Sequence, residues 1–475
     1  MHVFRYCFSF RRREQMGIGD GEAGSAAAQR TKWIDGLRGI ASVMVIVTHL
    51  TRAFDIDLFI PQSREDGEPR LMQLPFLRIA PQGRIGVTIF AFLTGYVCAL
   101  KPLKQTRAGD PAAALSTVAK SAFRRTPRLV LPAILATFFA WTLAQFGAFK
   151  VAHRCDSEWI RVASPNVEAT LRKEIYRFFV TVITTWTNGR NDYDDHQWSL
   201  LPLLRGSMTV YTVLSATVYM KPRYRILATA GLYWFFFWAK DETFGMQAVY
   251  GMFMADLTQH APVQRFIAQH RWMEMVLTPI LMIGGLYLAS FPAACAEWTP
   301  WSNRLLEIAR WVFPNDADIP RFYSAIGLDL VIMGIHLSTT ARDVLTHRLL
   351  LFLGRNSFAV YLIHGTLLRT VLIWMLYGIS GQPWTAQVPH EGDGDPPPPT
   401  YLPMRGASVI AVAFPAWVLL VYTAAHLWTT HVDSACARLS QRLEKHAFET
   451  DNGAGTLVSH TRHPALVDPS QKARQ

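Results

Sequence analysis

Residues 33–50 read WIDGLRGIASVMVIVTHL, a mostly apolar run that nevertheless carries the ionisable side chains Asp35, Arg38 and His49. Its length approaches the roughly 20 residues that an α-helix needs to cross the hydrocarbon core of a bilayer. Placing a charged side chain in that core costs about 2.5–3.5 kcal/mol on insertion scales. The run therefore predicts a membrane-spanning helix whose polar side chains face a cavity inside a bundle of helices.

The spacing of these three side chains puts them on one stripe of the helix. Asp35 and Arg38 are three residues apart, a spacing at which side chains meet on a helix surface. His49 follows Arg38 by eleven residues, which is about three turns and about 16 Å along the axis. Because the pKa of free histidine lies near 6.5, His49 suits proton transfer. An equally simple interpretation makes His49 an interfacial residue and lets Arg38 extend to the inner headgroups.

The rest of the chain repeats this apolar pattern. Of its 475 residues, 50% are hydrophobic and only 17% are charged, whereas a soluble protein carries about a quarter charged residues. We predict an all-α integral membrane protein, a polytopic bundle of about ten transmembrane helices. The expected spans are Ile34–Leu50, Ile85–Leu100, Leu129–Phe149, Leu200–Tyr219, Ile226–Ala239, Phe244–Leu257, Met275–Phe291, Tyr323–Leu337, Leu349–Tyr377 and Ala407–Trp428.

Basic side chains alternate between the connections and indicate how the helices are oriented. They gather before the first span, after the second and in later even-numbered connections, which by the positive-inside rule puts both termini in the cytosol. The formal charge of +12 is then explained by loops beside anionic lipid, and no nucleic-acid partner is expected. The choice among endoplasmic reticulum, Golgi and plasma membrane stays open.

Polar ends flank the expected membrane domain of residues 33–428. Residues 1–32 are basic and rich in glycine and alanine, and we expect a disordered cytosolic arm. Residues 429–475 are expected to form a cytosolic tail, with an amphipathic helix at 432–448 on the inner leaflet and then a disordered end. The cysteines lie far apart without a CxxC pair or a Cys/His cluster, so no metal is expected.

A second group of ionisable residues precedes the third expected span. Arg124, Arg125 and Arg128 lie on successive turns at the predicted start of that helix, and Pro127 between them costs little there. Guanidinium groups in such an arrangement suit a phosphorylated ligand. The alternative is an ordinary basic anchor at the cytosolic end of a span.

These motifs resemble those of the membrane-bound acyltransferase-3 family, in its fungal branch. The family's first-span motif is an arginine and a histidine separated by ten residues, as Arg38 and His49 are, and its Arg-x-x-Arg element is matched by Arg125-Thr-Pro-Arg128. Further similar stretches are Gly86-Val-Thr-Ile-Phe-Ala-Phe-Leu-Thr-Gly95-Tyr96, Trp198-Ser-Leu, Arg205-Gly-Ser-Met and Leu353-Gly-Arg-Asn-Ser-Phe-Ala-Val-Tyr361-Leu-Ile-His364. Together the similar stretches extend over about residues 33–428 in the family's order.

The resemblance implies transfer of an acyl group, often acetyl, from acyl-CoA to a hydroxyl of a glycan, a lipid or a secondary metabolite. It implies that His49 takes the proton from the acceptor hydroxyl, and that Arg38 positions the donor or stabilises developing negative charge. Asp35 would orient Arg38 by an ion pair. The phosphates of coenzyme A are expected on the arginine cluster, namely Arg124, Arg125 and Arg128.

One position departs from the family's pattern. The family carries a glutamate shortly after its Trp-Ser/Thr-Leu element, and Leu203 stands at that position here. Asp194 and Asp195 lie nearby in sequence, and they either substitute for that carboxylate or belong to a solvated acidic surface. His364 either lines the same cavity or forms a hydrogen bond to a neighbouring helix, and we favour the second.

Two other functions fit the same residues. A transporter for a lipid or an anionic solute also uses ionisable groups deep in a span, although no inverted repeat of broken helices is recognisable. The missing glutamate is equally compatible with a catalytically silent relative. The interpretation that we carry forward is an acyl-CoA-dependent O-acyltransferase in the bilayer, acting on a hydroxyl-bearing acceptor.

Overall fold

A computed structural model describes residues 21–382 and 400–448 of the chain. In these two ranges the regular structure is helical, and the β interaction found there is one isolated bridge between Cys155 and Leu402. The α-helices are α1 (Gly21–Phe54), α2 (Ile79–Gln82), α3 (Arg84–Arg107), α4 (Pro111–Gln145), α5 (Glu158–Ala163), α6 (Leu171–Thr187), α7 (Leu200–Thr217), α8 (Pro222–Trp238), α9 (Gly245–Thr258), α10 (Ala261–Gln269), α11 (Thr278–Ala289), α12 (Pro300–Val312), α13 (Ile319–Leu337), α14 (Thr339–Leu345), α15 (Arg348–Leu367), α16 (Ile373–Tyr377), α17 (Ala407–Trp428) and α18 (Ser434–Phe448).

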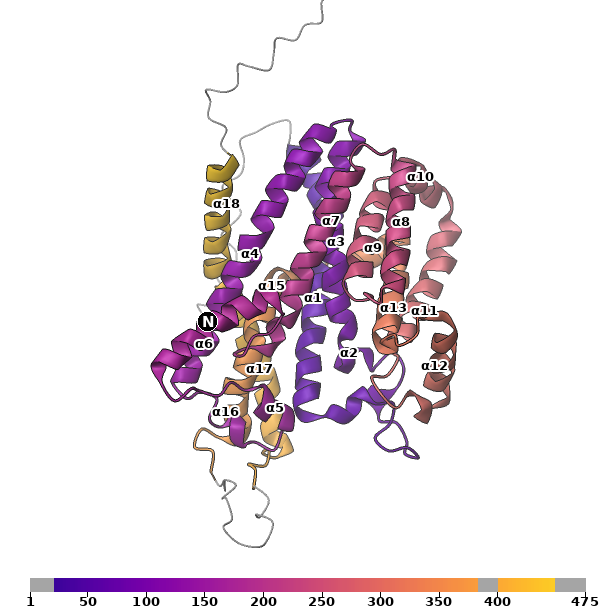
Figure 1. The fold of residues 1–475 in the computed structure, drawn as a ribbon. Coiled ribbons are helices and arrows are strands. Elements are labelled where there is room, and N and C mark those ends of the chain that lie inside the picture. The colour runs from indigo at the N-terminus through magenta and orange to yellow at the C-terminus, as the bar shows by residue number, and fades with distance from the viewer. Residues whose placement is uncertain (1–20, 383–399, 449–475) are drawn as a thin grey trace, which may run out of the picture.

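The long helices stand side by side as a bundle, and the short helices α2, α5, α12 and α16 lie toward one end of it (Figure 1). Three π-helical turns extend neighbouring helices, and five 3-10 turns lie in the connections. The π turns are Met273–Leu277, Leu368–Leu372 and Thr429–Asp433, and the 3-10 turns are Ile56–Phe59, Leu71–Gln73, Ala152–Arg154, Asp195–Ser199 and Ala296–Trp298.

Each segment expected to span the membrane is helical over most of its length. By length and composition, five helices can cross a membrane, or up to seven if each of two bent helix pairs is one span, among the residues described. The expected number of about ten is therefore not confirmed. Helices α8 and α9 have 17 and 14 residues, which at ~1.5 Å per residue fall short of a hydrocarbon core of ~30 Å.

Helix α1 lies directly against α14 and α15, and glycines allow the close approach. A Cβ atom at Gly354 of α15 would collide with the backbone carbonyl oxygen of Asp35, and one at Gly36 would collide with that of Leu345. Small residues let membrane helices approach at backbone distance. The contact fixes the ionisable stripe of α1 beside the helix that carries His364.

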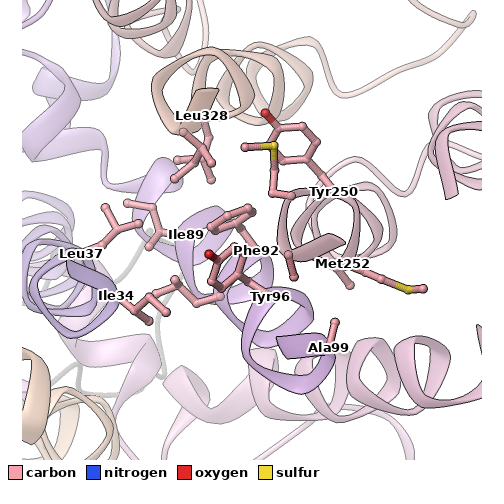
Figure 2. Packing of buried hydrophobic residues seen from close by; sticks show 14 of the residues in the cluster. Ile34, Leu37, Ile89, Phe92, Tyr96, Ala99, Tyr250, Met252 and Leu328 are labelled. Carbon is pink, nitrogen blue, oxygen red and sulfur yellow. The ribbon is translucent and has the colours of Figure 1, made fainter. Parts of the chain in front are cut away.

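Another side of α1 packs into a hydrophobic core cluster shared with α3, α9 and α13. Figure 2 shows Ile34 and Leu37 of α1 turned toward Ile89 and Phe92 of α3, with Tyr250 of α9 on the opposite side of these α3 side chains. Lipid tails are as apolar as these side chains, so close packing rather than transfer from water holds such helices together. Helix α1 is thus packed against other helices on two sides, and its ionisable side chains have a fixed orientation.

The third expected span is the end of a much longer helix. Helix α4 begins at Pro111, where the carboxylate of Asp110 caps it by accepting a hydrogen bond from the backbone N–H of Ala113 at 2.8 Å. The arginine cluster therefore lies inside the helix, and the prediction that Pro127 stands at a helix start is wrong. The alanine-rich residues 111–122 favour a helix, which extends α4 well before the apolar segment.

The two ends of the expected membrane domain are also helical. Helix α1 already begins at Gly21, before the expected start at residue 33. Helices α17 and α18 form one helix of 42 residues through the π turn between them, so the expected tail helix continues the last span. It packs against α4, where Glu444 and Arg124 form an ion pair at 3.3 Å. The remainder of the expected disordered ends, 1–20 and 449–475, lies outside the described residues.

Candidate active site

A cavity of about 1240 Å³ lies between the helices of the bundle. Its wall includes side chains from α1, α3, α4, α7, α15 and α18. Among the residues lining it are the six to which the sequence analysis gives a catalytic or donor-binding role, namely Asp35, Arg38, His49, Arg124, Arg125 and Arg128. The stripe on α1 therefore faces a cavity between helices, together with the arginine cluster of α4.

One part of the wall, which we call the arginine region, consists of Arg38, Arg124, Arg125 and Arg128. Arg125 donates from Nε to the Ser207 hydroxyl at 3.0 Å and from Nη2 to the Thr94 hydroxyl at 3.2 Å. These two contacts fix the guanidinium between α7 and α3 without neutralising its charge. Concentrated guanidinium charge of this kind suits a phosphorylated ligand.

Arg38 and Arg124 differ from Arg125 because each has a carboxylate partner. Arg38 pairs with Asp35 at 3.2 Å, which is the ion pair expected from their spacing. Arg124 pairs with Glu444 of α18 at 3.3 Å, and about a third of the Arg124 side chain remains exposed (36%). Helix α18 therefore helps to shape this part of the cavity.

A second part, which we call the histidine region, consists of His49, His196 and His364. The three histidines come from separate elements: α1, the turn Asp195–Ser199 and α15. His364 Nε2 lies 2.9 Å from His49 Nδ1, and the rings of His196 and His49 are nearly perpendicular, with 4.1 Å between centroids. Trp159 stacks on His49 with 6.0 Å between centroids. His49 and His196 line the cavity.

Hydrogen-bond partners determine which ring nitrogens of this region carry protons. His364 Nδ1 lies 2.8 Å from the carbonyl oxygen of Val360 and 3.0 Å from that of Tyr361, so it carries a proton and donates. The neutral ring then accepts at Nε2, and His49 Nδ1 donates to it. Neutral His49 consequently has its lone pair on Nε2, where it can accept a proton.

His196 is held by a fully buried carboxylate. Its Nδ1 donates to Asp194 Oδ1 at 2.8 Å, and Arg369 Nη2 donates to the same oxygen at 2.8 Å. Burial lowers the pKa of His196 well below its ordinary value, so the ring is neutral. Its lone pair is on Nε2, which is buried and has no hydrogen-bond partner among the described residues. An Asp–His pair in this tautomer is the arrangement that orients histidines in many proton-transfer sites.

The cavity continues along α1 beyond the histidine region. Arg52 lines it, and the distance along α1 from Arg38 to Arg52 is about 21 Å at ~1.5 Å per residue. Arg84 at the start of α3 and Arg321 with Asp318 near the start of α13 line the cavity as well. The histidines therefore lie between two polar parts of one cavity.

The sequence alone did not decide the roles of His364, Asp194 and Asp195, and the structure shows where each of them lies. His364 forms a hydrogen bond to His49 of α1, which matches the option favoured for it, and it is not among the residues lining the cavity. Asp194 is buried in the histidine region, whereas Asp195 is exposed and lines the cavity. Leu203 also lines the cavity, so a carboxylate at that position would reach it.

Sequence reasoning missed His196, Arg369 and Trp159. Arg369 offered a signal, because an arginine inside the expected span Leu349–Tyr377 is costly in lipid and demands a buried partner. His196 stands two residues before Trp198 in a stretch similar to the family. Neither signal names the partner, since Asp194 and Arg369 are 175 residues apart in sequence.

The histidine region also offers a set of nitrogen ligands for a metal ion. One ring nitrogen of each histidine lies within 4.8 Å of the other two. Two nitrogens bound to one tetrahedral zinc ion, at about 2.05 Å each, are about 3.3 Å apart. The 2.9 Å between His49 Nδ1 and His364 Nε2 is shorter and typical of a hydrogen bond. The geometry therefore favours a shared proton over a shared metal ion at these two nitrogens.

Comparisons with known proteins match most of the chain. A family model described as "Acyltransferase domain" matches residues 31–421. The O-acetyltransferase PaAT-1 of Phomopsis amygdali is 27% identical over 377 residues, which cover 72% of this chain and 73% of that protein. Acyltransferase R4 of a Phoma species is 24% identical over 423 residues, 74% of this chain and 86% of that protein. Acyltransferase clz18 of Cochliobolus lunatus is 22% identical over 409 residues, 70% and 82% of the two chains. No solved structure matches.

Proposed function

Since the chain belongs to the acyltransferase-3 family and is a membrane acyltransferase, we propose that it moves an acyl group from acyl-CoA to a hydroxyl, with His49 as general base. Acetyl is the expected group, because one relative, from Phomopsis amygdali, is named as an O-acetyltransferase. The acceptor is a hydroxyl of a glycan, a lipid or a secondary metabolite.

The observation that carries this proposal is the lone pair on His49 Nε2 in a cavity shared with the arginine region. His49 Nε2 accepts the proton of the acceptor hydroxyl as the oxygen attacks the thioester carbonyl carbon. The tetrahedral intermediate then collapses, the carbon–sulfur bond breaks, and the coenzyme A thiolate takes the proton from His49. An ester and free coenzyme A leave, and His49 is neutral again.

The arginine region holds the donor in this proposal. Coenzyme A carries several phosphate groups, and guanidinium groups bind phosphate by charge-assisted hydrogen bonds. Arg125 and Arg128, with Arg124 beside them, bind these phosphates. Arg38, oriented by Asp35, lies on the same helix as His49 and stabilises negative charge on the donor.

The acceptor enters from the part of the cavity that lies beyond the histidines. The alternation of basic connections supports a cytosolic arginine region, where acyl-CoA is available, with both chain termini on that side. Donor and acceptor then approach His49 from opposite parts of one cavity, which brings the two reacting groups together at the lone pair.

The test is transfer of label from radiolabelled acetyl-CoA by the purified protein in lipid vesicles, with hydroxyl-bearing lipids, sugars and polyhydroxylated metabolites as acceptors. We expect His49→Ala to lower kcat by about 10²–10⁴-fold, the usual effect of losing a general base. His336→Ala is the matched control, because His336 is also a buried histidine but does not line the cavity. Unchanged turnover in folded His49→Ala protein contradicts the proposal.

A further inference from the structure

We propose that His196, held by Asp194, is a positioning residue that stabilises the protonated form of His49 during acyl transfer. This inference rests on the proposed function, since it assigns His49 as the base. It also identifies a carboxylate for the site. That carboxylate is Asp194, in the segment before α7, and it acts through an imidazole rather than from position 203.

The first observation is the unused lone pair of His196. Its Nδ1–H is committed to Asp194, and its Nε2 has no partner in the described part of the chain, although the side chain is only 2% exposed. An unsatisfied buried acceptor of this kind costs free energy and calls for an explanation. The neighbouring ring is that of His49, 4.1 Å away between centroids. When His49 takes a proton, the ring that carries this lone pair is the immediate neighbour of the new cation.

The second observation is the rigidity of the support behind His196. Asp194 Oδ1 accepts from both His196 Nδ1 and Arg369 Nη2, each at 2.8 Å, and Arg369 also donates to the backbone carbonyl oxygens of Gly365 and Tyr193. Arg369 is completely buried (0% exposed). The Asp194 hydrogen bond keeps the proton on His196 Nδ1 and therefore keeps the lone pair on Nε2.

The third observation is the space that a glycine leaves for His196. Gly365 follows His364 in α15, and a Cβ atom there would collide with the His196 ring at Nδ1 and lie 2.9 Å from Asp194 Oδ1. Any other residue at 365 would push the pair away from the histidines. The absence of a side chain at this position of a regular helix is explained by the close approach of His196.

Together these contacts place two neutral imidazoles beside His49: His364, whose Nε2 accepts from it, and His196, whose Nε2 is free to accept. A newly formed imidazolium in a largely buried site needs compensation, because a lone cation there is poorly solvated. Two oriented lone pairs supply it without placing a permanent negative charge beside the thiolate that must leave. Asp194 contributes from one step further away, and Arg369 offsets its charge.

The experiment is the pH dependence of kcat for wild-type enzyme and His196→Phe in vesicles. Phenylalanine keeps an aromatic ring but removes the lone pair. Protonated His49 then loses support, so we expect the acidic limb of the kcat profile to move to lower pH by about one unit. A weaker base also lowers the plateau of kcat, by about three- to tenfold, while the KM for acetyl-CoA stays unchanged.

The charged and titratable groups facing His49 and His196 are His364, Arg52, Asp194 and Arg369. All of them remain in His196→Phe, so a difference between the two profiles reports His196. His336→Phe is the matched control for replacing a buried histidine, and we expect its acidic limb to stay in place. If His196→Phe does not fold, His196→Gln keeps an acceptor at the position of Nε2 and is expected to shift the limb less than one unit.

An unchanged acidic limb in folded His196→Phe overturns the inference, whether or not kcat falls, because packing alone does not move that limb. A stoichiometric transition metal in the purified enzyme, whose removal abolishes activity and whose return restores it, also overturns the inference, since the three histidines would then be ligands. Failure of the proposed function is distinguishable, because it requires an active His49→Ala enzyme.

Discussion

The arginine region and the histidine region line one cavity but are built in opposite ways. Three of the four arginines come from a single helix, α4, and Arg125 is fixed by two neutral hydroxyls. The histidines come from three elements and depend on each other for tautomer and orientation. In the proposed function the arginines bind one donor as separate cations, so losing one is expected to weaken binding. The three histidine rings depend on one another for the position of their protons, so displacing one ring disturbs the other two.

The largest effect that this comparison predicts outside the histidines themselves comes from Gly365→Ala. The new methyl group would collide with the His196 ring and crowd Asp194, so the histidine region must move. We expect kcat to fall by roughly 10- to 100-fold, the loss typical of mutating residues that orient a metal ligand, with the KM for acetyl-CoA unchanged. Steady-state kinetics in vesicles measures both.

Gly231→Ala is the matched control for that change. Gly231 lies inside α8, and apart from its chain neighbours and the backbone of its own helix no described residue has an atom within 4 Å of the position its Cβ would take. The same substitution there is expected to leave kcat unchanged, because it only raises helix propensity. A Gly365→Ala enzyme with wild-type kcat would mean that the histidine region tolerates displacement, and the contrast between the two regions would disappear.

The same contrast explains what the sequence could and could not predict. Arg38 and His49 lie on one helix, so helical spacing alone put them on one face, and both line the cavity. The arginine cluster was visible as neighbours in sequence. The contact of His49 with His196 and His364 depends on three separate elements meeting, which no local spacing encodes. The helical class followed from apolar runs, but their number as membrane spans did not.

The predicted helix boundaries were wrong for a related reason. The sequence offers apolar length as a signal for a span, and it does not report where a polar helix continues beyond the bilayer. Helix α4 therefore extends back to Pro111, because alanine-rich polar sequence with an Asp110 cap is as helical as the apolar part. The continuation of α17 into α18 through a π turn could not be predicted from the sequence either.

The next largest effect is expected in the arginine region. Arg125→Ala removes one guanidinium, and we expect the KM for acetyl-CoA to rise about tenfold, within the range for a hydrogen bond to a charged group. The same is expected of Arg128→Ala. Because the other arginines remain, kcat at saturating donor should change little. Initial rates at varied acetyl-CoA separate the two parameters.

Arg107→Ala is unsuitable as a control, because Arg107 pairs with buried Asp256 and supports the fold. Arg223→Ala is the better one, since Arg223 lies at the start of α8, contacts Tyr224 and does not line the cavity. Its KM for acetyl-CoA is expected to match that of the wild type. A rise confined to the KM for the acceptor in Arg125→Ala would contradict the donor role of the arginine region.

The smallest effect, and the one that joins both regions, concerns Leu203. This residue lines the cavity, and its carbonyl oxygen accepts a hydrogen bond at 2.8 Å from Ser207, the residue that holds Arg125. Because Asp194 already supplies a carboxylate to the histidines, Leu203→Glu should not raise kcat. The new charge would instead lie in the same cavity as the arginines and compete with phosphate, raising the KM for acetyl-CoA about two- to fivefold.

Leu203→Gln is the matched control, because glutamine has the shape of glutamate without the charge, and it should leave that KM unchanged. If Leu203→Glu increases kcat while Leu203→Gln does not, the site lacks a carboxylate that Asp194 fails to replace, and the two regions are less complete than their contacts indicate.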